Sequence, residues 1–273
     1  MIDLSFKYKD AISFLLNESP FIPEIAVVLG SGLGNFAEST EKIKSVSTSV
    51  IPNYPLPSVE GHKGMIHFSK INEKKVLIFQ GRNHFYEGYG ISDCILPVLL
   101  TKKINCKKII FTNAAGGVNI NFRPGDLMLV ESFNSINLKK ELADLIGISS
   151  VESKNNFLNC PSERMNKVIR LAAKENLIEL QSGIYWYSKG PSYETPAEIK
   201  MIEKFGGDAA GMSTVHEAVY ASFIGMELAI ISCITNMAAG ILPQKLSHQE
   251  VTETANQSAE KFTILLKSSI SRL

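Results

Sequence analysis

Apolar and polar positions follow two alternating patterns along the chain. Continuous apolar runs of strand length, bounded by turn residues, predict buried β-strands at 25–29, 76–80, 108–112, 125–133, 182–190 and 226–236. Apolar residues at helical spacing lie between these runs, as at Met165, Val168, Ile169 and Ala172. This alternation predicts a single α/β domain over residues 1–273. Polar residues that could bind a ligand cluster where the predicted strands end, which is where the site of such a domain lies.

Capping residues predict the ends of the helices. Thr195 is an N-cap, Pro196 fits the first helical position, Glu198 completes a capping box, and Gly206 and Gly207 end that helix. Further helices are predicted at 11–16 and 91–103 and after the caps Ser162 and Ser247.

Two segments lack a clear period. Residues 139–160 are polar and poorly periodic, so we expect a variable loop or an interface segment there. Residues 113–117 (NAAGG) predict a strand-to-turn junction of small residues, at which the backbone can contact a ligand.

Composition narrows the class of partner. The chain has 273 residues, 45% of them hydrophobic and 20% charged, and a net charge of +1 without a basic run. These values argue against a nucleic-acid or membrane-surface partner and favour a small neutral or modestly anionic ligand. We read neither a secretory signal nor a membrane span, and the four scattered cysteines indicate reduced thiols in a cytoplasmic protein.

A glycine-rich turn follows the first predicted strand. Residues 30–34 read GSGLG, so backbone amides of this loop and the Ser31 hydroxyl could hold an anion of phosphate size. A dinucleotide site is the weaker interpretation, because the spacing is GxGxG and no acid ends a convincing second strand about 20 residues later.

Three polar side chains follow the strand at 76–80. Arg82, His84 and Tyr86 stand at alternate positions and share one face if the chain stays extended. Guanidinium, imidazole and phenol suit an oxyanion beside a sugar hydroxyl; solvated side chains are the alternative. His62, in the Pro- and Gly-rich segment before them, fits either a mobile lid or a solvent-facing histidine.

Residues 190–217 hold candidate chemistry at both ends of one predicted helix. The ring of Tyr193, the acceptor Glu194, the apolar Met212 and the hydroxyl of Ser213 would suit a planar heterocycle, a sugar and an oxyanion. Core packing for Tyr193 and Met212, solvation of Glu194 and a capping role for Ser213 are equally compatible with this stretch alone.

Seven segments together resemble the trimeric purine nucleoside phosphorylases. In order they read GSGLG, GRNHFYEGY, TNAAGG, GPSYETPAE, GMSTVHE, SCITNMAAG and LSHQEV, and they cover roughly residues 25–251. The resemblance implies one domain with a central mixed, partly barrel-like β-sheet flanked by helices, and a homotrimer.

The resemblance also implies roles for particular residues, with Asn236, His84 and Glu194 as the catalytic ones. Inorganic phosphate, a co-substrate, would be held by Ser31, Arg82, His84, the Ala114 backbone, Ser213 and His62. The ribose would be lined by Tyr86, Met212 and His248, and the purine by Tyr193, Glu194, Asn236 and Val251. No cofactor is expected, and HEAVY at His216 lacks the second histidine of a HExxH zinc site.

Two positions bear on specificity. In the similar methylthioadenosine phosphorylases an aspartate stands at the position of Asn236, and a smaller, less polar group at that of His248, so this chain is expected to prefer 6-oxopurine nucleosides. A methylthioadenosine or broader purine nucleoside phosphorylase, and a non-catalytic nucleoside-binding protein, are the alternatives. Phe157 is a candidate for the aromatic residue that relatives place over the neighbouring subunit's site.

Overall fold

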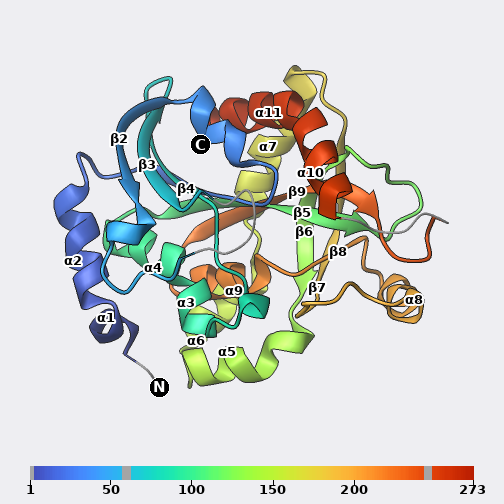
Figure 1. Cartoon of the computed structure of the whole chain (residues 1–273), viewed down its shortest axis with the longest axis horizontal. Coiled ribbons are helices and arrows are strands. Elements are labelled where there is room, and N and C mark those ends of the chain that lie inside the picture. The colour runs from blue at the N-terminus through green and yellow to red at the C-terminus, as the bar shows by residue number, and fades with distance from the viewer. Residues whose placement is uncertain (1–2, 57–62, 243–247) are drawn as a thin grey trace.

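The computed structural model describes residues 3–56, 63–242 and 248–273, and in residues 248–250 only the backbone (Figure 1). In this part of the chain nine strands form one sheet in the order β2-β3-β4-β1-β5-β8-β7-β6-β9. Their bounds are β1 (Ile25–Leu29), β2 (Glu41–Ser47), β3 (Met65–Ile71), β4 (Lys74–Gln80), β5 (Lys108–Gly117), β6 (Leu127–Asn134), β7 (Leu180–Tyr187), β8 (Ala209–Gly211) and β9 (Glu227–Met237).

The sheet is mixed and closes on itself over half its width. The pairs β4–β1, β1–β5 and β5–β9 are parallel. The pairs β2–β3, β3–β4, β5–β8 and β6–β9 are antiparallel. Because β9 pairs with β5 as well as with β6, the strands β5, β8, β7, β6 and β9 form a closed five-stranded barrel. The expected fold class is therefore confirmed.

Helices cover both faces of the sheet (Figure 1). The helices are α1 (Leu4–Lys7), α2 (Lys9–Glu18), α3 (Ile91–Cys94), α4 (Leu96–Lys103), α5 (Lys139–Ile146), α6 (Val151–Leu158), α7 (Glu163–Glu175), α8 (Pro196–Lys204), α9 (Val215–Phe223), α10 (His248–Gln257) and α11 (Ala259–Arg272). Alternation along β1 separates two cores: Ala26 and Val28 pack with α4 and α9, whereas Val27 and Leu29 pack with α7 and α11.

Local signals predicted several of these elements correctly. Strand β1 has the predicted bounds, and Ser162 caps α7 by accepting from the Met165 amide. Helix α8 starts at the predicted capping box, in which the Glu198 carboxylate accepts from the Thr195 amide and the Glu198 amide donates to the Thr195 hydroxyl. The predicted cap Ser247 lies outside the described residues.

Three expectations about secondary structure were wrong. Residues 139–160 contain α5 and α6, because Leu142 and Leu145 are buried against the rest of the core even though the segment is polar overall. The helix expected at 91–103 is two helices that meet at Ile95. Residues 113–117 continue strand β5, since their small side chains let β8 and β9 pair on either side.

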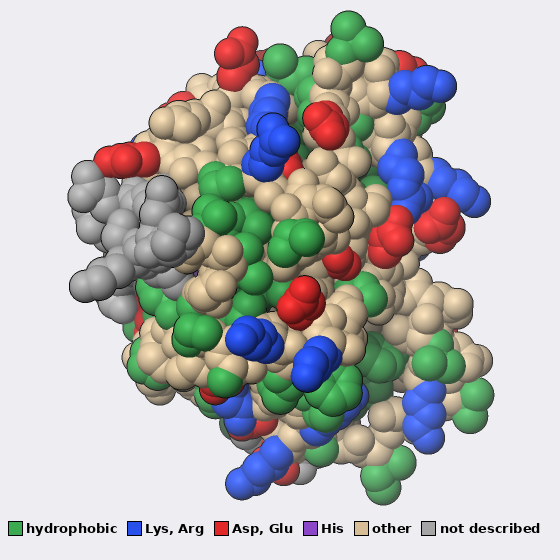
Figure 2. Space-filling model, turned by 90° about the vertical axis from the view of Figure 1, so that its right-hand side faces the viewer, with side chains coloured by type: hydrophobic (Ala, Val, Ile, Leu, Met, Phe, Trp, Pro, Cys, Tyr) green, Lys and Arg blue, Asp and Glu red, His purple; other side chains and the backbone are tan. Residues whose placement is uncertain are grey.

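Charges are mixed over the surface. On the face of the molecule that Figure 2 shows, Lys and Arg side chains are interspersed with Asp and Glu, as the net charge of +1 implies. Among the described residues, none of the helices combines the length and the apolar character needed to cross a membrane. The four cysteines carry free thiols.

Candidate active site

One cleft lies where β1, β4, β5 and β9 end. It is lined by Gly30, Ser31, Arg82, His84, Tyr86, Asn113, Ala114, Ala115, Gly116, Tyr193, Glu194, Ala210, Gly211, Met212, Ser213, Thr235, Asn236, Ala238 and Val251. The structure thus brings together all the candidate residues from the sequence whose side chains it describes. His62 lies outside the described residues, and so does the side chain of His248 at the start of α10.

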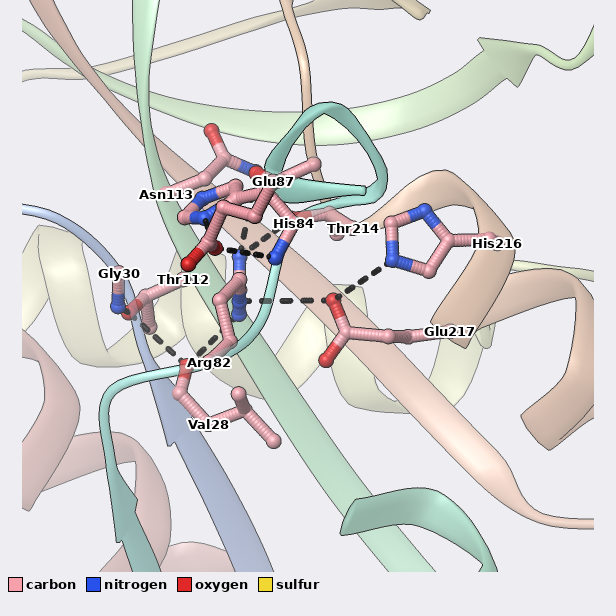
Figure 3. A network of polar contacts seen from close by, with 11 residues as sticks. Val28, Gly30, Arg82, His84, Glu87, Thr112, Asn113, Thr214, His216 and Glu217 are labelled. Carbon is pink, nitrogen blue, oxygen red and sulfur yellow. Dashed lines mark hydrogen bonds and ion pairs between the residues drawn. The ribbon is translucent and has the colours of Figure 1, made fainter. Parts of the chain in front are cut away.

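Arg82 is the fixed cation at one end of the cleft (Figure 3). Its Nη1 donates to the hydroxyls of Ser213 and Thr214 at 3.2 and 2.8 Å, and its Nη2 donates to the carbonyl of Val28 at 3.3 Å. Its side chain is fully buried. A guanidinium held on several sides keeps one orientation, which is what recognition of an oxyanion requires.

Glu217 of α9 lies behind Arg82. Its Oε2 is 3.4 Å from Arg82 Nε, and both side chains are fully buried. Burial raises the pKa of Glu217, while the neighbouring guanidinium opposes that shift. The adjacent His216 is also fully buried, and burial lowers its pKa to about 3, so its ring is neutral at pH 7.

His84 is oriented by Glu87. The Glu87 carboxylate accepts from the His84 amide at 2.6 Å and from Nδ1 at 2.9 Å. Burial lowers the pKa of His84, so the ring is neutral near pH 7 with its proton on Nδ1 and Nε2 as an acceptor. Such a ring can accept the P–OH hydrogen of monohydrogen phosphate.

The chain from Arg82 to Tyr86 is not extended, which was the condition for placing the three side chains on one face. Residues 85–87 form a 3₁₀ turn, yet Arg82, His84 and Tyr86 all line the cleft. The rings of His84 and Tyr86 stack at 4.8 Å between centroids. Burial raises the pKa of Tyr86 to about 12, so its phenol is a neutral hydrogen-bonding group at pH 7.

The glycine loop packs more tightly than the sequence suggested. The Gly30 amide donates to the Thr112 hydroxyl at 3.1 Å and so is engaged within the protein, contrary to the expectation that it faces an anion. A Cβ at Gly30 would stand 2.7 Å from Asn113 Cα, which explains the need for glycine. Ser31, the next residue, lines the cleft.

The other end of the cleft carries an acceptor and an amide. Glu194 Oε1 is buried and has no hydrogen-bond partner among the described residues, so it can accept from a ligand N–H. The amide of Asn236 is fixed at both ends: Oδ1 accepts from the Thr235 hydroxyl at 3.0 Å and Nδ2 donates to the Met237 carbonyl at 3.1 Å. Tyr193 lies beside Glu194 with 45% of its surface exposed.

Several residues of the site were not found from the sequence. Asn113 lines the cleft, and Glu87, Thr214 and Glu217 contact cleft side chains, but none of the four side chains was assigned a role. One signal was available, because Glu217 and His216 interrupt an otherwise apolar helix and so predict buried partners. Phe157 does not line the cleft; its ring packs on Phe133 of the same chain.

The geometry defines a class of protein. A buried cation with hydroxyls at one end of a cleft, and a carboxylate with an amide at the other, fits an enzyme that joins an oxyanion to a compound with a planar nitrogen ring. Within the part of the chain that the structure covers, no cluster of His, Cys, Asp and Glu could hold a metal ion.

Comparisons with known proteins agree with this class. A family model described as "Phosphorylase superfamily" matches residues 24–271. Purine nucleoside phosphorylase 1 of Geobacillus stearothermophilus is 39% identical over 263 residues, which are 95% of this chain and 94% of that protein.

Solved structures agree as well. The Schistosoma mansoni purine nucleoside phosphorylase in complex with adenosine is similar with a TM-score of 0.88 at 29% identity, covering 98% of this chain and 97% of that one. The same enzyme in complex with inosine gives a TM-score of 0.88 at 28% identity over 98% and 96% of the two chains. The chain belongs to the purine nucleoside phosphorylase family of the phosphorylase superfamily.

Proposed function

We propose that the chain catalyses the reversible phosphorolysis of inosine, guanosine and their deoxy forms to the free purine base and (deoxy)ribose 1-phosphate. The observation that carries this proposal is the presence of both subsites in one cleft: Arg82 and Ser213 at one end, Glu194 and Asn236 at the other. A module that only bound nucleosides would have no need for a buried cation aimed at an anion.

Phosphate would occupy the end of the cleft that holds Arg82. Arg82, Ser213, Ser31 and the Ala114 backbone would bind its charged oxygens, and Nε2 of His84 would accept from its hydroxyl. Glycosyl transfer passes through a transition state with oxocarbenium character. Holding the anionic nucleophile against the positive C1′ therefore lowers the barrier by proximity and by charge complementarity.

The purine would lie between Tyr193, Val251, Glu194 and Asn236. As the bond to C1′ breaks, negative charge develops on the base. The Nδ2 of Asn236 carries a second hydrogen beyond the one given to Met237, and we assign it to N7 or O6 of the purine. Glu194 would accept from a ring N–H, and Tyr86, Met212 and His248 would enclose the ribose.

The preference for 6-oxopurines rests on this amide. O6 of hypoxanthine is an acceptor and needs a donor, whereas the 6-amino group of adenine is a donor and is better matched by a carboxylate. The Schistosoma mansoni relative has been solved with inosine and with adenosine, so methylthioadenosine phosphorylase activity or a broader purine specificity is the alternative.

The active unit is proposed to be a single domain over residues 1–273 that assembles as a cytoplasmic homotrimer. It would use no cofactor, and inorganic phosphate would be its co-substrate. The single nine-stranded sheet of the described residues supports the first part. The resemblance to the trimeric family supports the assembly, and the free thiols favour a reducing compartment.

The test is to incubate the purified protein with inosine and to follow hypoxanthine with and without inorganic phosphate. Release only with phosphate, together with ribose 1-phosphate, is expected. Release without phosphate would instead identify a hydrolase. Faster turnover of adenosine or methylthioadenosine than of inosine would select the alternative specificity.

A further inference from the structure

Thr214 occupies an unusual place between the anion subsite and helix α9. Its backbone has φ +73° and ψ −46°, in a region that β-branched residues rarely adopt, and its side chain is fully buried. Such a conformation is strained and persists only where the surrounding structure holds it. In this protein it directs the Thr214 hydroxyl toward groups from two other elements.

The hydroxyl of Thr214 already accepts twice. Arg82 Nη1 donates to it at 2.8 Å, and Asn113 Nδ2 donates to it at 3.0 Å. Neither a guanidinium nor an amide NH₂ can accept in return, and a hydroxyl has two lone pairs and one hydrogen. Both lone pairs of the Thr214 hydroxyl are therefore used, and only its hydrogen remains to be donated. Ser213 Oγ lies 3.2 Å away and can accept it.

The same accounting then applies to Ser213. Its Oγ accepts from Arg82 Nη1 at 3.2 Å and from the Thr214 hydroxyl, so both of its lone pairs are used. Its own hydrogen is therefore left to donate, either to the Tyr185 phenol beside it or to a ligand in the cleft. Ser213 lines the cleft at the end where Arg82 provides the positive charge.

We propose that Thr214 is a positioning residue for phosphate: its hydroxyl fixes the hydrogen-bond polarity of Ser213, so that Ser213 presents a hydrogen to the anion. This inference rests on the proposed function, since phosphate is the anion. Thr214 does not line the cleft; it acts through Ser213, which does.

Thr214→Val tests the proposal, because it removes the hydroxyl and keeps the shape, while Thr214→Ser keeps the hydroxyl. We expect Thr214→Val to weaken the binding of inorganic phosphate about tenfold, as the loss of one oriented hydrogen bond implies. Thr214→Ser should stay within about threefold of the wild type, and inosine affinity measured without phosphate should stay within about twofold in both.

Phosphate binding is measured by isothermal titration with inorganic phosphate, so the result does not depend on turnover. If the wild type binds phosphate without cleaving inosine, the proposed function fails and the assignment of Thr214 is still decided. Equal phosphate affinity in the wild type and in Thr214→Val would overturn the assignment of Thr214. If Thr214→Val does not fold, Thr214→Ala replaces it; alanine leaves a gap where valine adds a methyl group. The same loss of phosphate affinity is expected.

Two further variants separate this role from a purely structural one. If Thr214 acts through Ser213, the double variant Ser213→Ala/Thr214→Val binds phosphate little worse than Ser213→Ala, whereas additive losses would contradict the proposal. Tyr185 is the control, because its phenol also lies near Ser213. Tyr185→Phe should leave phosphate affinity unchanged, and a loss as large as that of Thr214→Val would assign the orienting role to the phenol instead.

Discussion

Replacing Asn236 by aspartate tests how the cleft recognises the purine. The side chain is only 5% exposed, and the Thr235 hydroxyl holds its Oδ1 at 3.0 Å. The introduced carboxylate would keep that acceptor but would exchange the NH₂ group for an oxygen. Both hydrogens of Nδ2 would be lost, the one donated to Met237 and the one assigned to the base.

The expected size of the effect follows from these two losses. A donor to charge that develops in a transition state contributes about 10²–10³-fold to turnover, so kcat/KM for inosine should fall by at least about 10². Adenosine offers a 6-amino donor to the new carboxylate and should lose less or gain. The inosine to adenosine ratio of kcat/KM should therefore fall, by about 10² or more where turnover of adenosine is unchanged.

The variant should also be less stable. The Met237 carbonyl would lose its donor, which costs about 1–3 kcal/mol for a buried group. Asn166→Asp is the matched control, because Asn166 is 2% exposed and its Nδ2 likewise donates to a backbone carbonyl, that of Val130, at 3.2 Å. This control should lower the free energy of unfolding similarly and leave the substrate ratio unchanged.

The assay is steady-state phosphorolysis of inosine and adenosine at saturating phosphate, with urea unfolding of each variant. An unchanged inosine to adenosine ratio in Asn236→Asp would refute the role given to this amide. A ratio that changed equally in Asn166→Asp would trace the effect to general loosening of the fold.

Three further outcomes are expected. Arg82→Ala should raise the KM for phosphate by about 10² or more. It should also lower the free energy of unfolding by about 3–5 kcal/mol, because Glu217 loses its buried partner. A nucleoside KM that rises as much as the phosphate KM would contradict the placement of Arg82 in the phosphate subsite. Burial lowers the pKa of His216 to about 3, so its contribution to stability is complete above pH 6.5 and is lost as the pH falls toward 3. In urea unfolding at pH 7 and pH 5 the wild type should lose about 2 kcal/mol more than His216→Asn, and an equal loss in the two proteins would exclude a buried neutral histidine. Thr195→Ala removes the cap of α8 and should lower the free energy of unfolding by about 1 kcal/mol and raise the KM for inosine, since Glu194 precedes the cap, and an unchanged melting temperature would show that the cap is dispensable.

Local sequence signals determined those parts of the protein that depend on neighbours along the chain. The apolar run at 25–29 predicted β1 because a strand that is buried on both faces is apolar at every position, whichever elements pack against it. The box of Thr195 and Glu198 predicted the start of α8 because both groups lie within one helical turn. The seven family segments named the candidate residues of the cleft, which the structure brings together wherever it describes their side chains.

Tertiary structure alone decided how those residues act. Thr214 meets Arg82 and Asn113 across 132 and 101 residues of chain, and no periodicity or spacing encodes such a contact. The contacts exist because β8 pairs with β5 and because β1 lies between β4 and β5, which sets the ends of distant strands around one cleft. Which hydroxyl donates and which accepts then follows from the number of lone pairs and hydrogens that meet there, and that number is known only once the chain has folded.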